Sequence, residues 1–207
     1  MRYNPFQYDI SDYDLWYDEN YNIYQSEVNA IKFMVGDKDI GLEVGCGTGR
    51  FSVPLGINYC VDPSAKMCTI SYNKGIKNII RGDGTYLPLK DKIFDYVLFC
   101  TVLCFVENIE LTLKEAYRVL NSKGYIIAGI IDKNSFLGRV YEKKKNENKY
   151  YKYAKFLSTD ELLKELERVN FGEFEIVQTL FDFENRLYDV KHGYGKGGFV
   201  VIKAHKK

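Results

Sequence analysis

The stretch of sequence that decides the fold is LEVGCGTGRF, residues 42–51. An apolar run leads into it, a helical pattern follows it, and its three glycines have the spacing G-x-G-x-G. Glycine has no Cβ, so a ligand can approach this backbone closely. A pyrophosphate favours a helix N-terminus without a carboxylate nearby, whereas Glu43 stands two residues before the first glycine. The stretch therefore indicates a ligand that carries an ammonium group and a positive charge; the alternative is a tight turn that binds nothing.

Short apolar runs alternate with helical patterns from residue 39 onward, which predicts βαβ units and a parallel sheet. The expected parallel strands are Ile40–Gly45, Asn58–Val61, Asn78–Gly82, Phe94–Cys100 and Tyr125–Ile131. Two later candidates, Phe174–Leu180 and Gly198–Ala204, have no helix between them and should form an antiparallel hairpin. Helices are expected around Leu113–Leu120 and after Ser158, which forms a capping box with Glu161.

Polar residues stand where the second and third of these strands end. Asp62 follows the second strand, where a carboxylate can accept both hydroxyls of a ribose. Asp83 and Gly84 follow the third, where they could contact the amine and a ring nitrogen of adenine. Either acid could instead serve only as a helix cap or a turn residue. Because the carboxyl ends of parallel strands meet at one edge of a sheet, a ligand site is expected there.

Composition narrows the class of protein. The chain has 207 residues, 46% of them hydrophobic and 28% charged, which suits a globular domain that needs no disulfide or metal. Its net charge of +1 implies no general attraction to polyelectrolytes. Five cysteines in or near apolar runs indicate reduced thiols and a cytoplasmic protein. No apolar run reaches the roughly 18 residues of a membrane span, and no signal peptide or metal-ligand spacing is visible.

Four blocks in this order resemble the class I S-adenosylmethionine-dependent methyltransferases, most closely the type 11 group with its ubiquinone/menaquinone methyltransferase-like proteins. The blocks are LEVGCGTGRF (42–51), VDPS (61–64), GDGTYLPLKDKIFDYVLF (82–99) and YRVLNSKGYIIAGI (117–130). The resemblance implies an α/β fold: a Rossmann-like, seven-stranded methyltransferase sheet with helices on both faces and an antiparallel last strand beside the fifth. It also implies methyl transfer as the activity and S-adenosyl-L-methionine as the cofactor.

The resemblance assigns roles to individual residues. The glycine loop and Glu43 would surround the methionine part of the cofactor, Asp62 would bind the ribose, and Asp83 would contact the adenine. The implied cofactor-binding residues are Glu43, Gly45, Cys46, Gly47, Gly49, Asp62, Pro63, Met67, Asp83, Gly84, Thr101 and Val102. The sequence departs from its relatives after the fourth strand, where residues 99–105 contain no carboxylate or His that could act as a general base.

The whole chain, 1–207, is expected to be one methyltransferase domain. Its expected parts are an N-terminal helical lid (1–36), a cofactor-binding core (37–131), a substrate-lid insertion (132–157) and a C-terminal helix with a β-hairpin (158–207). The pocket candidates on these parts are Trp16, Tyr17, Tyr141 and Tyr194, although such aromatic side chains could also merely pack the lids on the sheet.

Charge is distributed unevenly between the two expected lids. Six acids and no Lys or Arg occur from Asp9 to Glu27, whereas six lysines and two acids occur from Tyr141 to Lys155. We expect these two segments to face each other across the pocket, held by weak ion pairs that salt can screen.

The candidate catalytic residues are His192, in the loop between the last two strands, and Tyr13. We expect metal-independent, in-line methyl transfer to a small molecule whose accepting atom is an amine, a hydroxyl or a thiol. The alternatives are methylation of RNA or a protein side chain, a module that binds the cofactor without catalysis, and a nicotinamide-dependent oxidoreductase. A nucleic-acid partner is not expected, since no N/D-P-P-Y/W tetrad follows the fourth strand.

Overall fold

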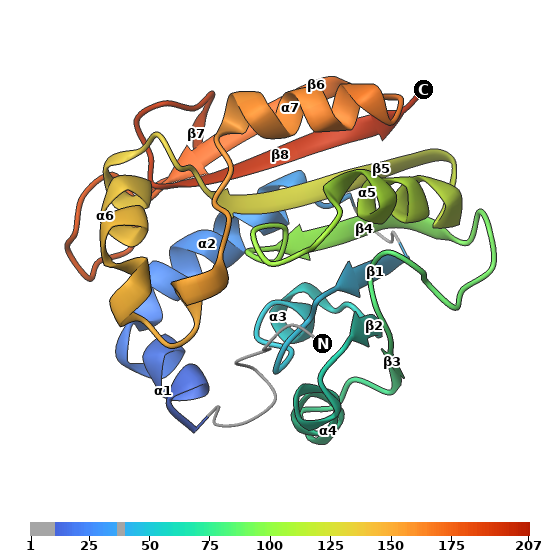
Figure 1. Ribbon diagram of the computed structural model, residues 1–207, viewed down its shortest axis with the longest axis horizontal. Helices are drawn as coiled ribbons and strands as arrows, with labels where there is room; N and C mark the ends of the chain where they lie inside the picture. The colour runs from blue at the N-terminus through green and yellow to red at the C-terminus, as the bar shows by residue number, and fades with distance from the viewer. Residues whose placement is uncertain (1–10, 37–39) are drawn as a thin grey trace.

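The computed structural model describes residues 11–36 and 40–207. Its centre is an eight-stranded sheet in the order β3-β2-β1-β4-β5-β8-β6-β7 (Figure 1). The strands are β1 (Gly41–Val44), β2 (Tyr59–Asp62), β3 (Asn78–Arg81), β4 (Phe94–Cys100), β5 (Leu120–Ile131), β6 (Phe171–Thr179), β7 (Lys191–His192) and β8 (Phe199–Lys206). The helices are α1 (Ser11–Glu19), α2 (Tyr21–Met34), α3 (Ser52–Leu55), α4 (Ala65–Asn73), α5 (Ile109–Val119), α6 (Phe136–Lys144) and α7 (Thr159–Arg168), with two 3₁₀ turns, η2 (Lys145–Glu147) and η3 (Tyr151–Tyr153).

Strand direction follows the expected pattern. β3, β2, β1, β4 and β5 pair in parallel, and β8 lies antiparallel between β5 and β6. The predicted fold class is therefore confirmed, with one difference in strand number. The expected seven strands omit β7, a two-residue strand that pairs with β6 at the edge of the sheet and is too short to show an alternating pattern.

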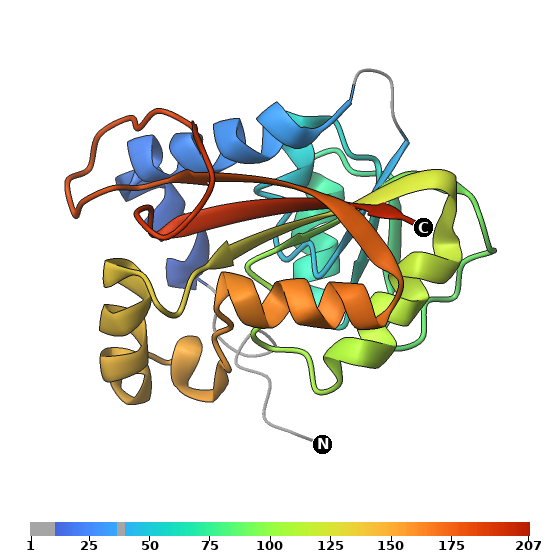
Figure 2. The same cartoon turned by 90° about the horizontal axis from the view of Figure 1, so that it is seen from above.

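Helices cover both faces of this sheet (Figure 2). α5 and α7 pack on one face, where Leu113 and Leu166 join Val97 and Phe99 in one apolar core. α2 packs on the other face, in a core that includes Leu98 of β4. Successive residues of β4 thus point to opposite faces, as a strand requires. α7 begins with the predicted capping box of Ser158 and Glu161, and α5 ends one residue earlier than expected because Leu120 already belongs to β5.

The lids lie at the ends of the parallel strands. α1 is next to α2 on the N-terminal side, and α6 with η2 and η3 follows β5 on the other side of the same edge. Across the residues that the structure describes, no helix combines the length and apolar character needed to cross a membrane.

Candidate active site

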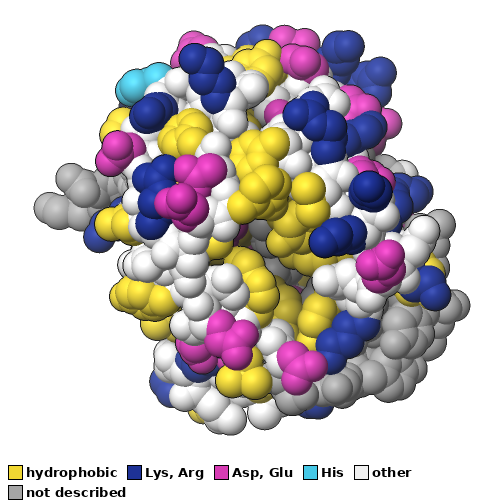
Figure 3. All heavy atoms as spheres, turned by 90° about the vertical axis from the view of Figure 1, so that its left-hand side faces the viewer, with side chains coloured by type: hydrophobic (Ala, Val, Ile, Leu, Met, Phe, Trp, Pro, Cys, Tyr) yellow, Lys and Arg dark blue, Asp and Glu magenta, His cyan; other side chains and the backbone are white. Residues whose placement is uncertain are grey.

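A cavity of about 950 Å³ opens at the carboxyl ends of the parallel strands. One part is lined by the ends of β1, β2 and β4 and by the loop after β3, and the other by α1, α2, α6 and the η2–η3 segment. Figure 3 views the molecule from the side of α1 and α6, where the surface is hollowed between hydrophobic side chains with charged side chains around them. The cavity therefore joins the predicted cofactor residues to the predicted lids.

The glycine loop depends on its glycines for two reasons. Gly45 and Gly47 both line the cavity and have positive φ values of 78° and 54°, a backbone conformation that favours glycine. A Cβ on Gly45 would also collide with the side chain of Val102 at the end of β4. The backbone N–H of Gly45 donates to the carbonyl of Val61 at 2.7 Å, which ties the loop to β2. The loop thus borders the cavity between the side chains of Val102 and Tyr13.

Asp62 lies at the junction of this loop and α4. Its carboxylate is 6% exposed and accepts hydrogen bonds from the backbone N–H groups of Gly47 and Ser64, each at 2.8 Å. Burial raises the pKa of Asp62, and the two N–H donors oppose that rise. A carboxylate has about four lone-pair positions, so Asp62 retains the capacity to accept hydrogen bonds from a ligand in the cavity.

The third strand end supplies Asp83 and Gly84, which also line the cavity. Oδ1 of Asp83 accepts from the backbone N–H and the hydroxyl of Thr85, at 2.8 and 2.7 Å, so a local turn fixes the side chain. Pro63 and the buried Met67 line the same part of the cavity. Two acids and a glycine loop that borders the cavity suit the hydroxyls, amine and ammonium of an adenosyl amino acid, so the residues present fit the implied cofactor.

Three of the implied cofactor residues do not line the cavity. Glu43 is 1% exposed and accepts a hydrogen bond from Ser52 on α3, because side chains alternate along β1 and Val44, not Glu43, faces the cavity. Burial raises the pKa of Glu43 well above its ordinary value. Cys46 is buried, and a Cβ on Gly49 would press on Ile76. Glu43 on β1 and the loop residues Cys46 and Gly49 therefore contact the protein interior instead of the cavity.

Asp14 of α1 makes several contacts with the glycine loop and α4. Its carboxylate accepts from the Thr48 hydroxyl at 2.6 Å and from Nε of Arg50 at 2.9 Å, and it pairs with Lys74 at 2.5 Å. Burial alone would raise the pKa of Asp14, but the hydrogen bonds of Lys74, Thr48 and Arg50 outweigh it and lower the pKa. Asp14 is one of six acids between residues 9 and 27, so the sequence pattern does not distinguish it from the others.

The acidic and basic lid segments meet as expected. Lys149 pairs with Asp12 at 2.8 Å, and the rings of Tyr13 and Tyr150 are in edge contact with their centroids 5.6 Å apart. Asp9 lies outside the described residues. Asp14 and Asp18 pair with Arg50 instead of the insertion, so the contact between the two lids is narrower than the predicted charge distribution suggests.

Aromatic side chains line the lid part of the cavity. They are Tyr13, Trp16, Tyr17, Tyr141, Tyr150, Tyr151 and Tyr153, of which the last three were not among the predicted pocket residues. The Tyr13 and Tyr17 hydroxyls are 3.1 Å apart, and burial raises the pKa of both. Tyr13 therefore keeps its proton at neutral pH and can act as a hydrogen-bond donor but not as a base.

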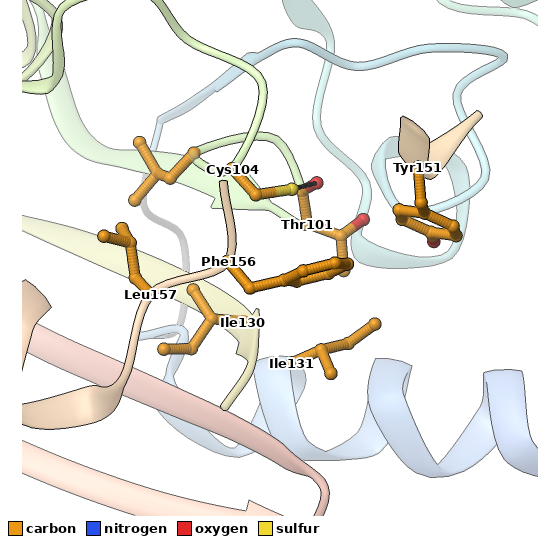
Figure 4. A pocket seen from close by; sticks show the side chains of 8 residues that line it. Thr101, Cys104, Ile130, Ile131, Tyr151, Phe156 and Leu157 are labelled. Atoms are coloured by element: carbon orange, nitrogen blue, oxygen red, sulfur yellow. Dashed lines mark hydrogen bonds between the residues drawn. The ribbon is translucent and has the colours of Figure 1, made fainter. Parts of the chain in front are cut away.

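The insertion is seated on the ends of β4 and β5. Figure 4 shows the Phe156 ring between Ile131 and the Thr101–Cys104 turn, with Tyr151 beside it. The cavity among these side chains is only about 10 Å³, so packing there is close. Thr101, Ile131 and Tyr151 also line the large cavity, so the packing of Phe156 fixes its wall.

Two predicted residues lie elsewhere. His192 belongs to the edge strand β7, is exposed, and contacts the ring of Phe33 on α2 with centroids 5.6 Å apart. The Tyr194 hydroxyl donates to Asp160 at 2.8 Å. Neither lines the cavity, because β8 and β6 separate β7 from the strand ends that form the site. The structure thus gives His192 no access to an acceptor in this cavity.

Glu27 on α2 is a cavity residue that the sequence analysis missed. It lines the cavity and is 7% exposed, and burial raises its pKa to about 8. The signal was present in the sequence, since Tyr24, Glu27, Val28 and Ile31 follow the i, i+3, i+4, i+7 spacing of one helix face. Acids are seldom buried, so an acid on the buried face of a helix indicates a structural or functional role for its carboxyl group.

Comparison with known proteins agrees with this geometry. A family model described as Methyltransferase domain (Methyltransf_11) matches residues 42–128. An uncharacterized protein of Methanocaldococcus jannaschii is 46% identical over 205 residues, 98% of this chain and 99% of its own length. The crystal structure of a SAM-dependent methyltransferase from Thermotoga maritima, described as a possible histamine N-methyltransferase, is 44% identical, covers 98% of both chains and has a TM-score of 0.95. Demethylmenaquinone methyltransferase of Staphylococcus aureus is 28% identical over 131 residues, 54% of each protein.

A parallel sheet with an antiparallel strand inserted beside the fifth, a glycine loop after β1 and an acid after β2 define a class I S-adenosylmethionine-dependent methyltransferase. The chain belongs to this family, in the type 11 group of methyltransferase domains, and S-adenosylmethionine is its cofactor.

Proposed function

We propose that the protein methylates a small molecule enclosed between the cofactor residues and the two lids, by in-line displacement and without a metal ion. The observation that carries this proposal is the continuous cavity of about 950 Å³, which extends from Asp62 and Asp83 to the aromatic lid. That volume is at the upper end for ligand pockets, which leaves room for an acceptor beside the cofactor. The ion pair of Lys149 with Asp12 joins the lids over this space.

The residues present suggest how each part of the cofactor would be held. Asp62 would accept the ribose hydroxyls, Asp83 and Gly84 would contact the adenine, and Gly45 and Gly47 would leave room for the methionine part. When bound, S-adenosylmethionine supplies a methyl group activated by a positively charged sulfur. The protein then needs to align an acceptor and exclude water, and alignment can contribute about 7–11 kcal/mol in the best intramolecular cases.

The wall at the end of β4 would border the reacting atoms. Cys100, Thr101 and Val102 line the cavity there, and Val102 packs against Gly45. Tyr13 and Tyr17 close the opposite side, and since one hydroxyl of the pair donates to the other, the pair offers at most one proton to an acceptor. Among the described residues, no three His, Cys, Asp or Glu side chains form a group that could hold a metal ion.

Methylation of RNA or protein is the alternative that the basic insertion could favour. Two of its lysines already have partners, however, since Lys149 pairs with Asp12 and Lys145 pairs with Glu142 at 2.8 Å. The acidic lid opposite them would also repel a phosphate backbone. These contacts favour a small acceptor in a covered cavity.

The test is transfer of a labelled methyl group from S-adenosylmethionine into a fractionated cell extract. We expect the label in the fraction of small molecules, with a rate unchanged by EDTA. Label found mainly in RNA or protein would overturn the small-molecule proposal, and a rate that falls in EDTA and returns with magnesium would overturn metal independence. An Asp62→Ala variant, which lacks the ribose acceptor, is the control for transfer that depends on this site.

A further inference from the structure

Four carboxyl groups are buried among the described residues, and they differ in their hydrogen-bond partners. Glu43 accepts from Ser52, Asp62 accepts from two backbone N–H groups, and Asp132 accepts from the backbone N–H of Asn134 at 2.7 Å and from Thr159. Glu27 is equally buried, yet within the described part of the chain it has no hydrogen bond or ion pair. A buried carboxyl group without a partner is costly to the fold, which points to a partner supplied from outside.

The Glu27 carboxyl group faces the cavity, where four titratable groups surround it from different elements. They are Tyr17 of α1, Cys100 of β4, Tyr141 of α6 and Tyr151 of η3, all of which line the same cavity. Burial is the main cause of the raised pKa of each, and the charge of Glu27 adds to it. All four therefore stay neutral at pH 7, and none of them can supply a positive charge to Glu27.

The part of the cavity around Glu27 favours some classes of ligand over others. Glu27 attracts a cation or a hydrogen-bond donor, and the tyrosine rings attract a cation through their faces. The other charged residues that line the cavity are Asp12, Asp62, Asp83, Glu107, Glu147, Lys149 and Lys155. A carboxylate or phosphate ligand would keep Glu27 protonated and could form no ion pair with it. A neutral alcohol could donate only one hydrogen bond and would leave the acid without a counter-charge.

We propose that Glu27 binds the amino group of the methyl acceptor, so that the substrate is a small amine carried into the cavity as an ammonium ion. This inference rests on the proposed function and names the substrate class of that site. Cys100 lies close enough to Glu27 for a charge on Glu27 to raise the pKa of the Cys100 thiol. Cys100 is the last residue of β4 and is followed by Thr101 and Val102. The bound amino group would thus lie near the end of β4.

Glu27 also provides the proton transfer that an amine acceptor needs. An ammonium nitrogen has no free electron pair, so one of its protons must first pass to the Glu27 carboxylate, which leaves a neutral amine and a protonated acid. The nitrogen pair can then form the new N–C bond while the electron pair of the broken C–S bond stays on sulfur. Glu27 gives up its own proton to solvent when the ammonium ion binds, so the transfer returns it to the protonated form of the free protein, and one proton is released over the cycle.

The experiment is calorimetric titration of the protein, saturated with S-adenosylhomocysteine, with 2-phenylethylamine, histamine and the neutral isostere 2-phenylethanol. We expect at least one amine to bind at least tenfold more tightly than the alcohol. The same titration in two buffers of different ionisation enthalpy gives the number of protons that the protein releases when the amine binds. Because free Glu27, with its pKa of about 8, is mostly protonated at pH 7, amine binding should release close to one proton.

The variant Glu27→Gln keeps the shape of the side chain and removes its charge. It should bind S-adenosylhomocysteine like the parent protein, lose at least tenfold in amine affinity and release no proton. Glu19→Gln, the same change at an exposed position of α1, should alter none of these values. If Glu27→Gln does not fold, the proton count of the parent protein decides the question.

The outcomes separate the two proposals. Amines that bind no better than the alcohol, amine binding without proton release, or full amine affinity in Glu27→Gln would each overturn the role of Glu27. A protein that binds S-adenosylhomocysteine but none of the three acceptor probes would also overturn it, while the methyltransferase proposal would stand. A protein that does not bind S-adenosylhomocysteine would contradict the proposed function itself.

Discussion

At the scale of single residues, burial and hydrogen bonding decide what each carboxyl group can do. Glu43 and Asp132 are enclosed by donors of the protein and serve its structure. Asp62 accepts from the backbone and also lines the cavity, which is why we propose a binding role beside its structural one. Glu27 lines the cavity with no partner among the described residues, which is why we propose that its partner is a ligand.

Replacing Asp62 by Ala should weaken binding of S-adenosylhomocysteine at least tenfold and also lower stability. The change removes the acceptor of the ribose hydroxyls and leaves the N–H groups of Gly47 and Ser64 without a partner, at a cost of about 1–3 kcal/mol. Calorimetry and thermal unfolding measure the two effects. Ser64→Ala is the matched control: it removes the α4 cap, worth about 1 kcal/mol, but should leave affinity unchanged. Unchanged affinity in Asp62→Ala would show that the acid is purely structural.

Glu27 should make the protein less stable as pH rises. Its pKa is about 8 in the folded protein against an ordinary value of 4.5, so the unfolded chain loses this proton first. Stability attributable to Glu27 therefore falls between about pH 4.5 and 8, by an amount on the order of a few kcal/mol. Denaturant unfolding of the parent protein and Glu27→Gln across this range should show curves that diverge toward high pH. Parallel curves would show that Glu27 ionises freely in the folded state.

At the scale of elements, the two lids are held by different forces. α6 and η3 are seated by apolar packing of Phe156 and Tyr151 on the strand ends. α1 combines packing of the buried Tyr17 on Tyr24 and Phe51 with ion pairs, through Asp14 to the glycine loop and through Asp12 to Lys149. The sequence predicted that the lids meet, because their opposite charges are visible as runs. The partners of Asp14 could not be predicted, because Thr48, Arg50 and Lys74 come together only in the folded chain.

Reversing the charge of one lid residue should loosen the contact between the lids. Asp12→Lys would place two lysines together, so amide hydrogen exchange of residues 11–19 and 145–153 should become faster in both segments. The double variant Asp12→Lys, Lys149→Asp restores an opposite pair and should recover slow exchange. High salt should reduce the difference in exchange rate between the parent protein and Asp12→Lys, since exposed charges are screened beyond about 8 Å at physiological ionic strength. Exchange that is equal in all three proteins would show that packing alone joins the lids.

At the scale of the whole molecule, strand order determines which residues can share a site. The G-x-G-x-G loop, Asp62 and Asp83 were predictable because each follows a strand of the parallel half, and parallel strands end at one edge. His192 was misplaced because the expectation took the whole loop between β6 and β8 to lie at that edge. The chain instead adds β7 on the far side of β6, a pairing of two residues that no sequence pattern marks.

Binding of S-adenosylhomocysteine should stabilise the whole molecule, because its site joins β1, β2, the loop after β3 and β4 across the parallel half of the sheet. We expect micromolar affinity, which corresponds to about −8 kcal/mol. At a concentration 100-fold above Kd the folded state gains about 2.7 kcal/mol. For a chain of this size that gain raises Tm by about 5–10 °C. S-adenosylmethionine should give a similar shift and NAD none, because Asp62 and Asp83 place acids where a pyrophosphate would need donors. A shift produced by NAD but by neither adenosyl ligand would contradict the assignment of this site.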